Sequence, residues 1–355
     1  MINREKIQRS NDRAEFLHNF LMGNKALLIV IVLSLILSIL SPVFLRITNL
    51  LNVCRQVCVS TLLSVGFTII LSSGHMDLSV GTLMGLCGMI LGLLLQDRYP
   101  LWFALLCCLV MGVVGGALNA ALITLFELPP FVVTLATQSI FKGTNYIISK
   151  LVPIVIMNRK LVFVGQGYFL GIPMPVYIAL LVVTIVWVIM NKTRFGRHVL
   201  AVGGNANAAR VCGINVNRMR FAVYMAEGLC IGIAAIVMTA RVASAQVSAG
   251  IGMEMDAIAA VVIGGTAMSG GNANVFGTMF GCLIVGIVNN GLNLLSIDTN
   301  WQVIAEGVLV LIAVVIDVTS RRSYAKRLSK QASLALRAEM EENRRQKEAE
   351  QSAEK

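Results

Sequence analysis

The stretch MPVYIALLVVTIVWVIM, residues 174–190, carries no charged side chain and is nearly long enough to cross a membrane. A second stretch, ALLIVIVLSLILSIL at residues 26–40, has the same character. A helix needs about 20 mostly apolar residues to span the hydrocarbon core. The chain of 355 residues is 57% hydrophobic and only 13% charged, whereas soluble domains carry about 25% charged residues. The sequence therefore predicts an all-α polytopic membrane protein.

Apolar runs predict about ten transmembrane helices along the chain. Residues 78–95 are rich in glycine and residues 255–269 form a short run, so both are candidates for half-helices or re-entrant segments. Irregular backbone is tolerated within a membrane only where protein buries it or where it lines a cavity. These two segments are therefore the first candidates for a transport pathway. The predicted spans are 26–41, 57–73, 78–95, 101–125, 131–149, 174–191, 221–240, 255–269, 275–295 and 302–318.

Positive charges gather in the N-terminal tail (1–25), the central loop 192–220 and the C-terminal tail (321–355). Membrane proteins keep Lys and Arg on the cytoplasmic side, so all three segments are expected in the cytoplasm. Six spans before the central loop and four after it satisfy this arrangement. Residues 26–320 then form the transmembrane domain, and the net charge of +11 reflects topology in preference to nucleic-acid binding.

The N-terminal segment, residues 150–173 and the cysteines are not expected to form a functional site. The polar first 25 residues have no cleavage site after an apolar core, so no cleavable signal peptide is expected. Residues 150–173, between the fifth and sixth spans, are expected outside as a turn or short helix. The eight cysteines show no metal-binding spacing and are interpreted as packing residues, not disulfides. No metal and no cofactor is predicted.

Two short segments resemble each other. GHMDLSVG (74–81) and GMEMDAIAA (252–260) each place an aspartate before small and apolar residues, and each begins a candidate irregular segment. Ten spans divided five plus five give halves of opposite topology, and inverted repeats around a central pathway are common in transporters. The pair therefore raises the hypothesis of an inverted repeat.

Motifs for catalysis are missing from the sequence. No Gly-x-x-x-x-Gly-Lys-Ser/Thr phosphate loop occurs, and GGNANAAR (203–210) lacks the Lys-Ser/Thr pair. Neither His-Glu-x-x-His nor Gly-x-Ser-x-Gly is present. We therefore predict no catalytic residue and no ATP hydrolysis by this chain itself.

Four acidic residues lie in or beside apolar runs, where ionisable groups are costly and often functional. Asp77 and Asp317 fall near predicted cytoplasmic ends, where a solvated or backbone-paired carboxylate is common. Glu227 and Glu306 lie deeper. A proton-coupled secondary carrier would need such a group, so this class of transporter stays open as an alternative.

Amide side chains are more numerous within the spans. Amides join helices at modest strength, and because each one both donates and accepts hydrogen bonds they also suit a path for a hydroxyl-rich solute. Both interpretations are open for each residue. The spacing of Asn289, Asn290 and Asn293 places members of this group on one helix face. The residues predicted for the translocation pathway are Asp77, Asn119, Gln138, Asn145, Asn289, Asn290 and Asn293.

The central loop TRFGRHVLAVGGNANAARVCGINVNRMR (193–220) contains an alanine-rich stretch. Asn205 is a good N-cap and Gly213 a good residue for the position after the helix end. This pattern predicts an exposed helix of about two turns between two spans. Such a helix could rest on lipid headgroups, but its alanines offer little apolar bulk for lipid. Its small residues favour close docking onto a partner protein.

Four segments together resemble a known family: SGHMDLSVGT (73–82), GALNAALITLFELPPFVVTLATQSIFKG (116–143), TRFGRHVLAVGGNANAARVCGINV (193–216) and DAIAAVVIGGTAMSGG (256–271). They are similar to the permease subunits of ribose-type importers of the ATP-binding-cassette (ABC) superfamily, which include ribose, xylose, galactose and autoinducer-2 permeases. The chain departs from that pattern at Asn272–Asn274, and at Glu227, where the family commonly has serine.

This resemblance implies a fold similar to the vitamin B12 importer permease, in the bacterial cytoplasmic (inner) membrane. It implies four kinds of partner: lipid, a second permease subunit (the same chain or a sister), an ABC ATPase with two fused cassettes, and an extracytoplasmic sugar-binding protein. The central loop would hold the coupling helix that docks on the ATPase. The matching residues are Gly203, Gly204, Asn205, Ala208, Ala209, Gly213 and Ile214.

Overall fold

The computed structural model describes residues 25–298, 300–312, 314–315 and 318–319. The two tails and Asp317 lie outside these residues. The chain divides into one unit that extends to Val310 and a second from Leu311 onward. The description below concerns the first unit.

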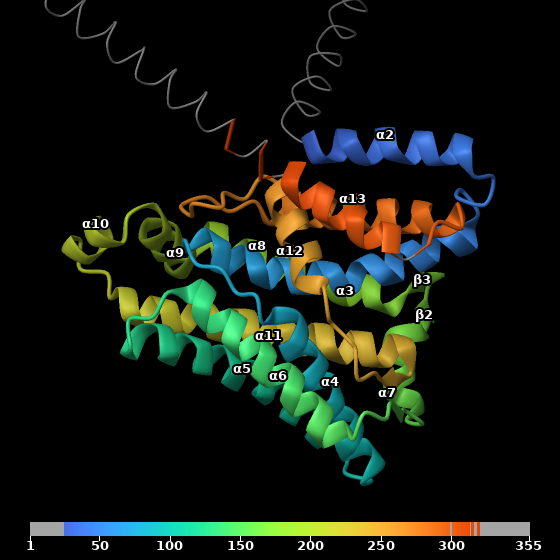
Figure 1. Cartoon of the computed structure of the whole chain (residues 1–355), viewed down its shortest axis with the longest axis horizontal. Coiled ribbons are helices and arrows are strands. Elements are labelled where there is room, and N and C mark those ends of the chain that lie inside the picture. Colours follow the sequence, from blue (N-terminus) through green and yellow to red (C-terminus); the bar gives the residue numbers. More distant parts are fainter. Residues whose placement is uncertain (1–24, 299, 313, 316–317, 320–355) are drawn as a thin grey trace, which may run out of the picture. The chain divides into compact units, whose positions relative to one another are not determined.

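Helices make up nearly all of this unit (Figure 1). The loops between helices contain two pairs of two-residue antiparallel strands. Strand β1 (Ile154–Val155) pairs with β4 (Ser244–Ala245), and β2 (Tyr168–Phe169) pairs with β3 (Ile172–Pro173). The helices are α2 (Lys25–Leu40), α3 (Ile47–Ser72), α4 (Val80–Gln96), α5 (Leu101–Leu125), α6 (Pro130–Ser149), α7 (Arg159–Gln166), α8 (Met174–Lys192), α9 (Arg194–Gly204), α10 (Ala206–Val211), α11 (Val216–Val242), α12 (Met253–Ile263), α13 (Val275–Leu294) and an unlabelled helix at Asn300–Ile312.

Among the residues that the structure describes, five helices are long and apolar enough to cross a membrane: α3, α5, α8, α11 and α13. Large apolar side chains are exposed on the outer helices, including Leu35, Trp102, Val114 and Leu181. Exposed apolar surface on this scale marks contact with lipid or another protein. The fold is therefore that of a multi-pass helical membrane protein.

The two candidate irregular segments differ from each other. Helix α12 has 11 residues and a length of about 17 Å, so it cannot cross a core about 30 Å thick. Helix α4 is longer, one uninterrupted helix of 17 residues, and it too is shorter than the five helices named above. Residues 150–173 contain the expected short helix, α7.

The glycines of α4 lie within a continuous helix and allow neighbouring segments to pack closely against it. They recur every three or four residues and so share one face. A Cβ at these positions would collide with the segment that ends α11 and leads into α12: Gly81 faces Gly250, Gly85 faces Ala249, Gly88 faces Thr239 and Gly92 faces Ala245. Small residues allow such close approach of backbones in membrane proteins.

Helices α5 and α11 are packed in the same way. Gly112 and Gly228 each leave no room for a Cβ because the other's carbonyl oxygen occupies that space. Gly116, one turn later, lies equally close to the carbonyl of Tyr224. Both helices contact the turn between α3 and α4, through Asn119 of α5 to Asp77 and Tyr224 of α11 to His75.

Candidate functional site

The central loop folds into two helices, α9 and α10, that lie at one end of the bundle (Figure 1). The predicted ends of α10 are confirmed. The side chain of Asn205 accepts hydrogen bonds from the backbone N–H groups of Asn207 and Ala208, both at 3.0 Å, and Gly213 follows the helix end with φ of 84°. Asparagine at the N-cap and glycine after the C-terminus are the preferred residues there.

Helix α9 was not expected from the sequence. Its buried face is formed by Gly196, Val199 and Val202, which recur at helical spacing. The hydroxyl of Thr193 caps its start by accepting from the N–H of Gly196. The surrounding basic residues lower the hydropathy of this stretch, which hid the pattern.

The coupling residues named from the sequence separate into two sets. Ala209 is buried in a small cluster with Val202 and Val216, and Ile214 packs on that cluster. Ala208 is exposed, and a Cβ at Gly204 would meet open space. Val211 is 89% exposed, a high value for a large apolar side chain. The surface that α10 presents outward therefore includes Ala208 and Val211 together with the polar Asn207 and Arg210, while Ala209 packs inside the loop.

The end of α9 is joined to two turns of the transmembrane part. Gly203 lies against the carbonyl of Ser72, the last residue of α3, and leaves no room there for a side chain. The N–H of Gly271, in the turn between α12 and α13, donates to the same carbonyl at 2.9 Å. Gly270 approaches both Gly74 and Gly203. We call this set of backbone contacts the glycine junction.

Asp77 lies in the turn that follows Ser72 and is 1% exposed. Its carboxylate accepts from the N–H and the hydroxyl of Ser79, both at 2.6 Å, and from the Asn119 amide at 2.9 Å. One of these donors is a backbone group and two are side chains, so the Asp77 carboxylate is buried and hydrogen-bonded. Glu227 is fully buried, and its carboxyl group interacts with that of Asp77.

Other predicted pathway residues surround the same helix, α4. Gln138 on α6 donates to the Glu254 carboxylate at 2.8 Å, and that carboxylate faces Gly81. Asn145, two turns further along α6, donates to the Val247 carbonyl at 2.9 Å and lies near Gly85. The two segments that resemble each other in sequence thus meet where α4 and α12 begin.

The asparagines of α13 form hydrogen bonds with residues that lie away from α4. Asn290 exchanges amide hydrogen bonds with Asn49 of α3, both at 3.0 Å. Asn289 donates to Glu306 at 3.3 Å, and Asn293 accepts from Gln302 at 2.8 Å. These contacts join α13 to α3 and to the Asn300–Ile312 helix, so the structure does not bring this group together with the amides around α4.

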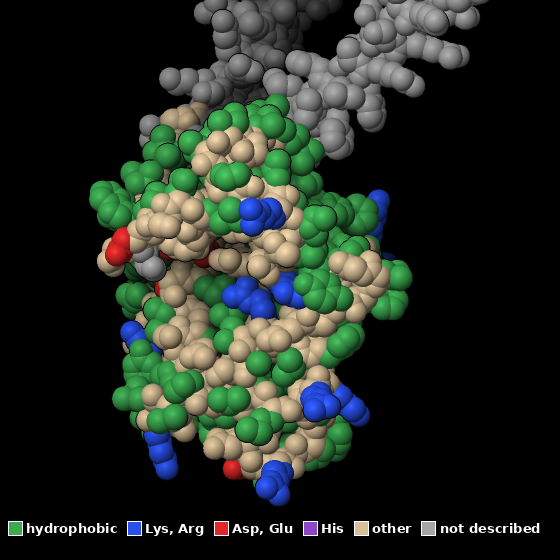
Figure 2. Space-filling model, turned by 90° about the vertical axis from the view of Figure 1, so that its right-hand side faces the viewer, with side chains coloured by type: hydrophobic (Ala, Val, Ile, Leu, Met, Phe, Trp, Pro, Cys, Tyr) green, Lys and Arg blue, Asp and Glu red, His purple; other side chains and the backbone are tan. Residues whose placement is uncertain are grey.

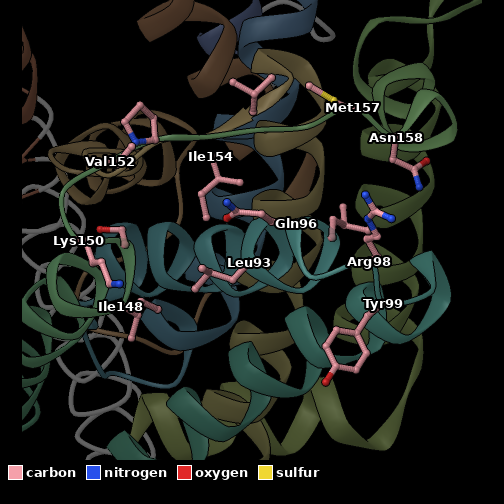
Figure 3. A pocket seen from close by; sticks show the side chains of 14 residues that line it. Leu93, Gln96, Arg98, Tyr99, Ile148, Lys150, Val152, Ile154, Met157 and Asn158 are labelled. Carbon is pink, nitrogen blue, oxygen red and sulfur yellow. The ribbon is translucent and has the colours of Figure 1, made fainter.

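At the end of the bundle opposite α9 and α10 lie two polar pockets. The larger, of about 880 Å³, is lined by the ends of α4 and α6 and by residues 152–158. Figure 3 shows Arg98, Tyr99, Lys150 and Asn158 around it. The second, of about 560 Å³, is lined by Asn52, Arg55, Gln56, Gln166, Tyr168 and Arg241. None of these residues was singled out from the sequence, although Arg55 and Arg241 stand out as charges near the ends of apolar helices.

The sequence matches known transport proteins over most of its length. Residues 49–314 match the family model described as branched-chain amino acid transport system / permease component. The chain is 40% identical to the ribose import permease protein RbsC of Bacillus subtilis (strain 168) over 289 residues, 81% of this chain and 89% of that protein. It is 37% identical to the D-allose transport system permease protein AlsC of Escherichia coli (strain K12) over 281 residues, 78% of this chain and 86% of that protein. No solved structure matches it. The chain therefore belongs to the family of the branched-chain amino acid transport system / permease component.

Proposed function

We propose that this chain is the membrane-spanning permease of an ABC importer that carries a sugar or a sugar-like solute into the cell. The observation that carries the proposal is its similarity to relatives named for sugars. The ribose, allose and fructose permeases are 33–40% identical to it over 78–87% of this chain. The matches cover 86–98% of the relatives' own lengths. The family model is described by amino-acid transport, but these long matches favour sugars.

The proposed power source is a separate ATPase, because the sequence holds no phosphate loop. We assign its docking surface to α10 and the end of α9, where Ala208 is exposed and Val211 protrudes. The full assembly would contain two permease subunits, an ATPase with two fused cassettes, and a sugar-binding protein. Substrate affinity would come mainly from that binding protein.

For the topology we propose ten membrane segments, with both tails and the loop 192–220 in the cytoplasm. Helix length supports this assignment for α3, α5, α8, α11 and α13, and positive charge supports the orientation. The meeting of α4 with the start of α12 supports an inverted repeat and an architecture similar to the vitamin B12 importer permease. The pseudo-symmetry axis would then pass near Gly81 and Gly250, which touch.

Coupling in this proposal proceeds through the glycine junction. A movement of α10 driven by the ATPase would displace Gly203, which contacts Ser72 directly. The turn after Ser72 leads into α4, and the turn that contains Gly271 connects α12 with α13. Both pathway helices would therefore move with the loop. Closely packed backbones transmit displacement because they leave no space to absorb it.

The translocation pathway is proposed to pass along α4, beside Asp77, Asn119, Gln138 and Asn145, with the α13 asparagines as a second group. Support comes from the density of hydrogen-bonding groups where α4 and α12 begin. Sites formed at the ends of interrupted helices near the bilayer midplane are common in transporters.

Reconstitution tests the proposed function. The chain is placed in proteoliposomes with its ATPase, and a sugar-binding protein loaded with ribose is added outside. The proposal predicts ribose uptake that requires internal ATP and all three components. Uptake by the chain alone that an ionophore abolishes would instead identify an ion-coupled carrier and contradict the proposal.

A further inference from the structure

Asp77 and Glu227 are acidic residues that lie buried inside the helix bundle. Figure 2 shows Lys and Arg side chains on the surface at the end opposite α10, whereas Asp77 is 1% exposed and Glu227 is 0% exposed. A buried carboxylate without a partner is strongly unfavourable, above all within a membrane-spanning segment. Each of these two carboxyl groups therefore needs a specific partner.

The Asp77 carboxylate has partners on both of its oxygens. Its Oδ1 accepts from the N–H and the hydroxyl of Ser79, and its Oδ2 accepts from the Asn119 amide. Three donors of this kind stabilise the charged form of a carboxyl group. Each carboxylate oxygen offers about two acceptor positions, so Oδ2 retains room for one further donor.

Glu227 lies on α11 beside the turn that contains Asp77. The two carboxyl groups lie within hydrogen-bonding reach of each other, and no other partner of the Glu227 carboxyl lies among the described residues. Two carboxylates in contact within a buried site cannot both carry a charge. The pair therefore shares one proton, and because Asp77 already receives three donors, Glu227 is the residue that keeps it.

The helices around this pair bring no cation that could replace the proton. Helices α4 and α5 carry no charged side chain. Helix α3 packs on the Glu227 backbone at Gly66, and its charged residue, Arg55, lies about three turns before Gly66. Basic residues are also present on α7, α9 and α10, which contact α11, but all of these are exposed: Arg159, Lys160, Arg194, Arg197, His198 and Arg210.

The other titratable groups near the pair are His75 in the turn and Arg220, Tyr224 and Cys230 on α11. Arg220 acts on His75 and on Tyr224, whereas Asp77 is the charged group that acts on Glu227. Within this cluster, the contact that satisfies Glu227 is the one with Asp77.

The carboxyl pair joins the turn between α3 and α4 to helix α11. Tyr224 and Glu227 are one helical turn apart and so share one side of α11. The Tyr224 ring meets the His75 ring edge-on, with 6.1 Å between the ring centres, and Glu227 meets Asp77 further along the same turn. This turn begins after Ser72 of the glycine junction and ends at α4. The pair therefore lies between the junction and the helix that is proposed to line the pathway.

We propose that Glu227 is a neutral acid that donates a hydrogen bond to Asp77, and that this shared proton positions the turn between α3 and α4 on α11. Glu227 acts through Asp77 and is a positioning residue. The proton remains with the pair, so the transport cycle neither takes it up nor releases it. The shared proton follows from the fold alone, whereas its part in transport rests on the proposed function.

Infrared spectra of the purified permease in nanodiscs test the shared proton without any partner. A protonated carboxyl group and a carboxylate have distinct C=O stretching bands, and the band of the protonated form shifts in D₂O. The parent should show a protonated-carboxyl band at neutral pH that is missing from Glu227→Gln. Glu127→Gln is the matched control because it makes the same change at an exposed acid, and it should keep the band. Identical bands in the parent and Glu227→Gln would overturn the inference.

Ribose uptake by proteoliposomes that contain the ATPase and receive loaded binding protein tests the positioning role. Glutamine keeps a neutral donor at the same length, so Glu227→Gln should take up ribose within about twofold of the parent. Leucine has a similar volume but no donor, so Glu227→Leu should lose uptake by about tenfold or more. Both variants remove the ionisable group, and the hydrogen-bond donor distinguishes them.

An equal loss in Glu227→Gln and Glu227→Leu would show that transport needs an ionisable group here, and parental uptake by Glu227→Leu would show that the hydrogen bond positions nothing. Either result overturns the inference. Should Glu227→Leu fail to insert, retained uptake by Glu227→Gln together with the infrared band still supports it, and lost uptake by Glu227→Gln overturns it. If the parent shows the infrared band but takes up no ribose, the proposed function fails while the shared proton stands.

Discussion

Gly203 at the end of α9 lies in direct contact with the carbonyl group of Ser72 at the end of α3. A residue of the central loop is thereby packed against the turn that leads to helix α4. The adjacent N–H of Gly271 donates to the same carbonyl, so three segments far apart in the sequence share one acceptor. In the proposed function, this contact transmits the ATPase movement.

Gly203→Ala should destabilise the permease and reduce transport. The added methyl group would overlap the Ser72 carbonyl and the Gly271 nitrogen, both backbone atoms, and overpacking of this kind costs about 1–3 kcal/mol. Gly204→Ala is the matched control because a Cβ there meets nothing within 4 Å. Thermal unfolding of the purified permease measures the difference. Equal melting temperatures for the two variants would show that the junction is not tightly packed.

Ala208→Asp and Ala209→Asp should fail in different ways. Ala208 is exposed, so an aspartate there should leave the loop folded but abolish ATPase docking and uptake. Ala209 is buried beside Val202 and Val216, and an unpaired buried carboxylate is strongly unfavourable. That variant should lose the loop structure itself. Pull-down of the ATPase, together with limited proteolysis at residues 193–220, distinguishes the two. Parental docking and uptake by Ala208→Asp would refute the assigned surface.

Asn205→Ala should weaken α10 without adding a clash. The two N–H groups of Asn207 and Ala208 would lose their acceptor, and loss of an N-cap costs about 1 kcal/mol. Asn205→Asp should restore the cap, since aspartate accepts the same bonds. Receptor-stimulated ATPase activity is the measurement, and it should fall in Asn205→Ala and recover in Asn205→Asp. An equal fall in both variants would point to a direct contact with the partner instead.

Asp77→Ala should be more damaging than Asp77→Asn. Removal of the carboxylate leaves the Ser79 N–H and hydroxyl without their acceptor and the Asn119 amide with only the Ser79 hydroxyl oxygen, and each buried unpaired group costs about 1–3 kcal/mol. An asparagine keeps one acceptor oxygen. A double-mutant cycle with Asn119→Ala should show coupling between the two positions. Additive losses in melting temperature would mean that this hydrogen bond contributes nothing.

Mild acid should destabilise the turn at residues 73–79 through His75. Burial, with a smaller contribution from the Arg220 cation, lowers the pKa of His75 to about 4. The unfolded chain binds a proton below about pH 6.5 while the folded protein stays neutral there. The free energy of unfolding should therefore fall by about 2 kcal/mol between pH 7 and pH 5. His75→Gln should flatten this part of the pH profile, and an unchanged slope in that variant would assign the effect to another group.

Local signals predicted the parts of the fold that depend on neighbouring residues. The asparagine and glycine around α10 gave its ends because capping is decided within a few positions of the chain. Helix α3 begins at Ile47, ten residues before the predicted span, because Asn49, Asn52 and Arg55 lower the apolar score of its first turns. Asn49 pairs with the Asn290 amide, and Asn52 and Arg55 line a pocket together with Arg241. Neither environment can be recognised from the local sequence.

Partners across the fold could not be predicted. Asn290 was identified as a candidate pathway residue, but its bond to Asn49 joins positions 241 residues apart. The glycines of α4 indicated a half-helix or a re-entrant segment because glycine weakens helices. Their real role depends on the 235–250 segment that packs against them, which the sequence of α4 does not reveal.

ATP-driven uptake of ribose by proteoliposomes, compared between the parental chain and Ala208→Asp, tests the central claim most directly. Both chains are reconstituted with the ATPase and with ribose-loaded binding protein outside. The proposed function predicts uptake by the parent that needs internal ATP, and none by Ala208→Asp although the variant inserts normally. Equal uptake by both chains, or parental uptake that persists without the ATPase and collapses with an ionophore, would contradict it.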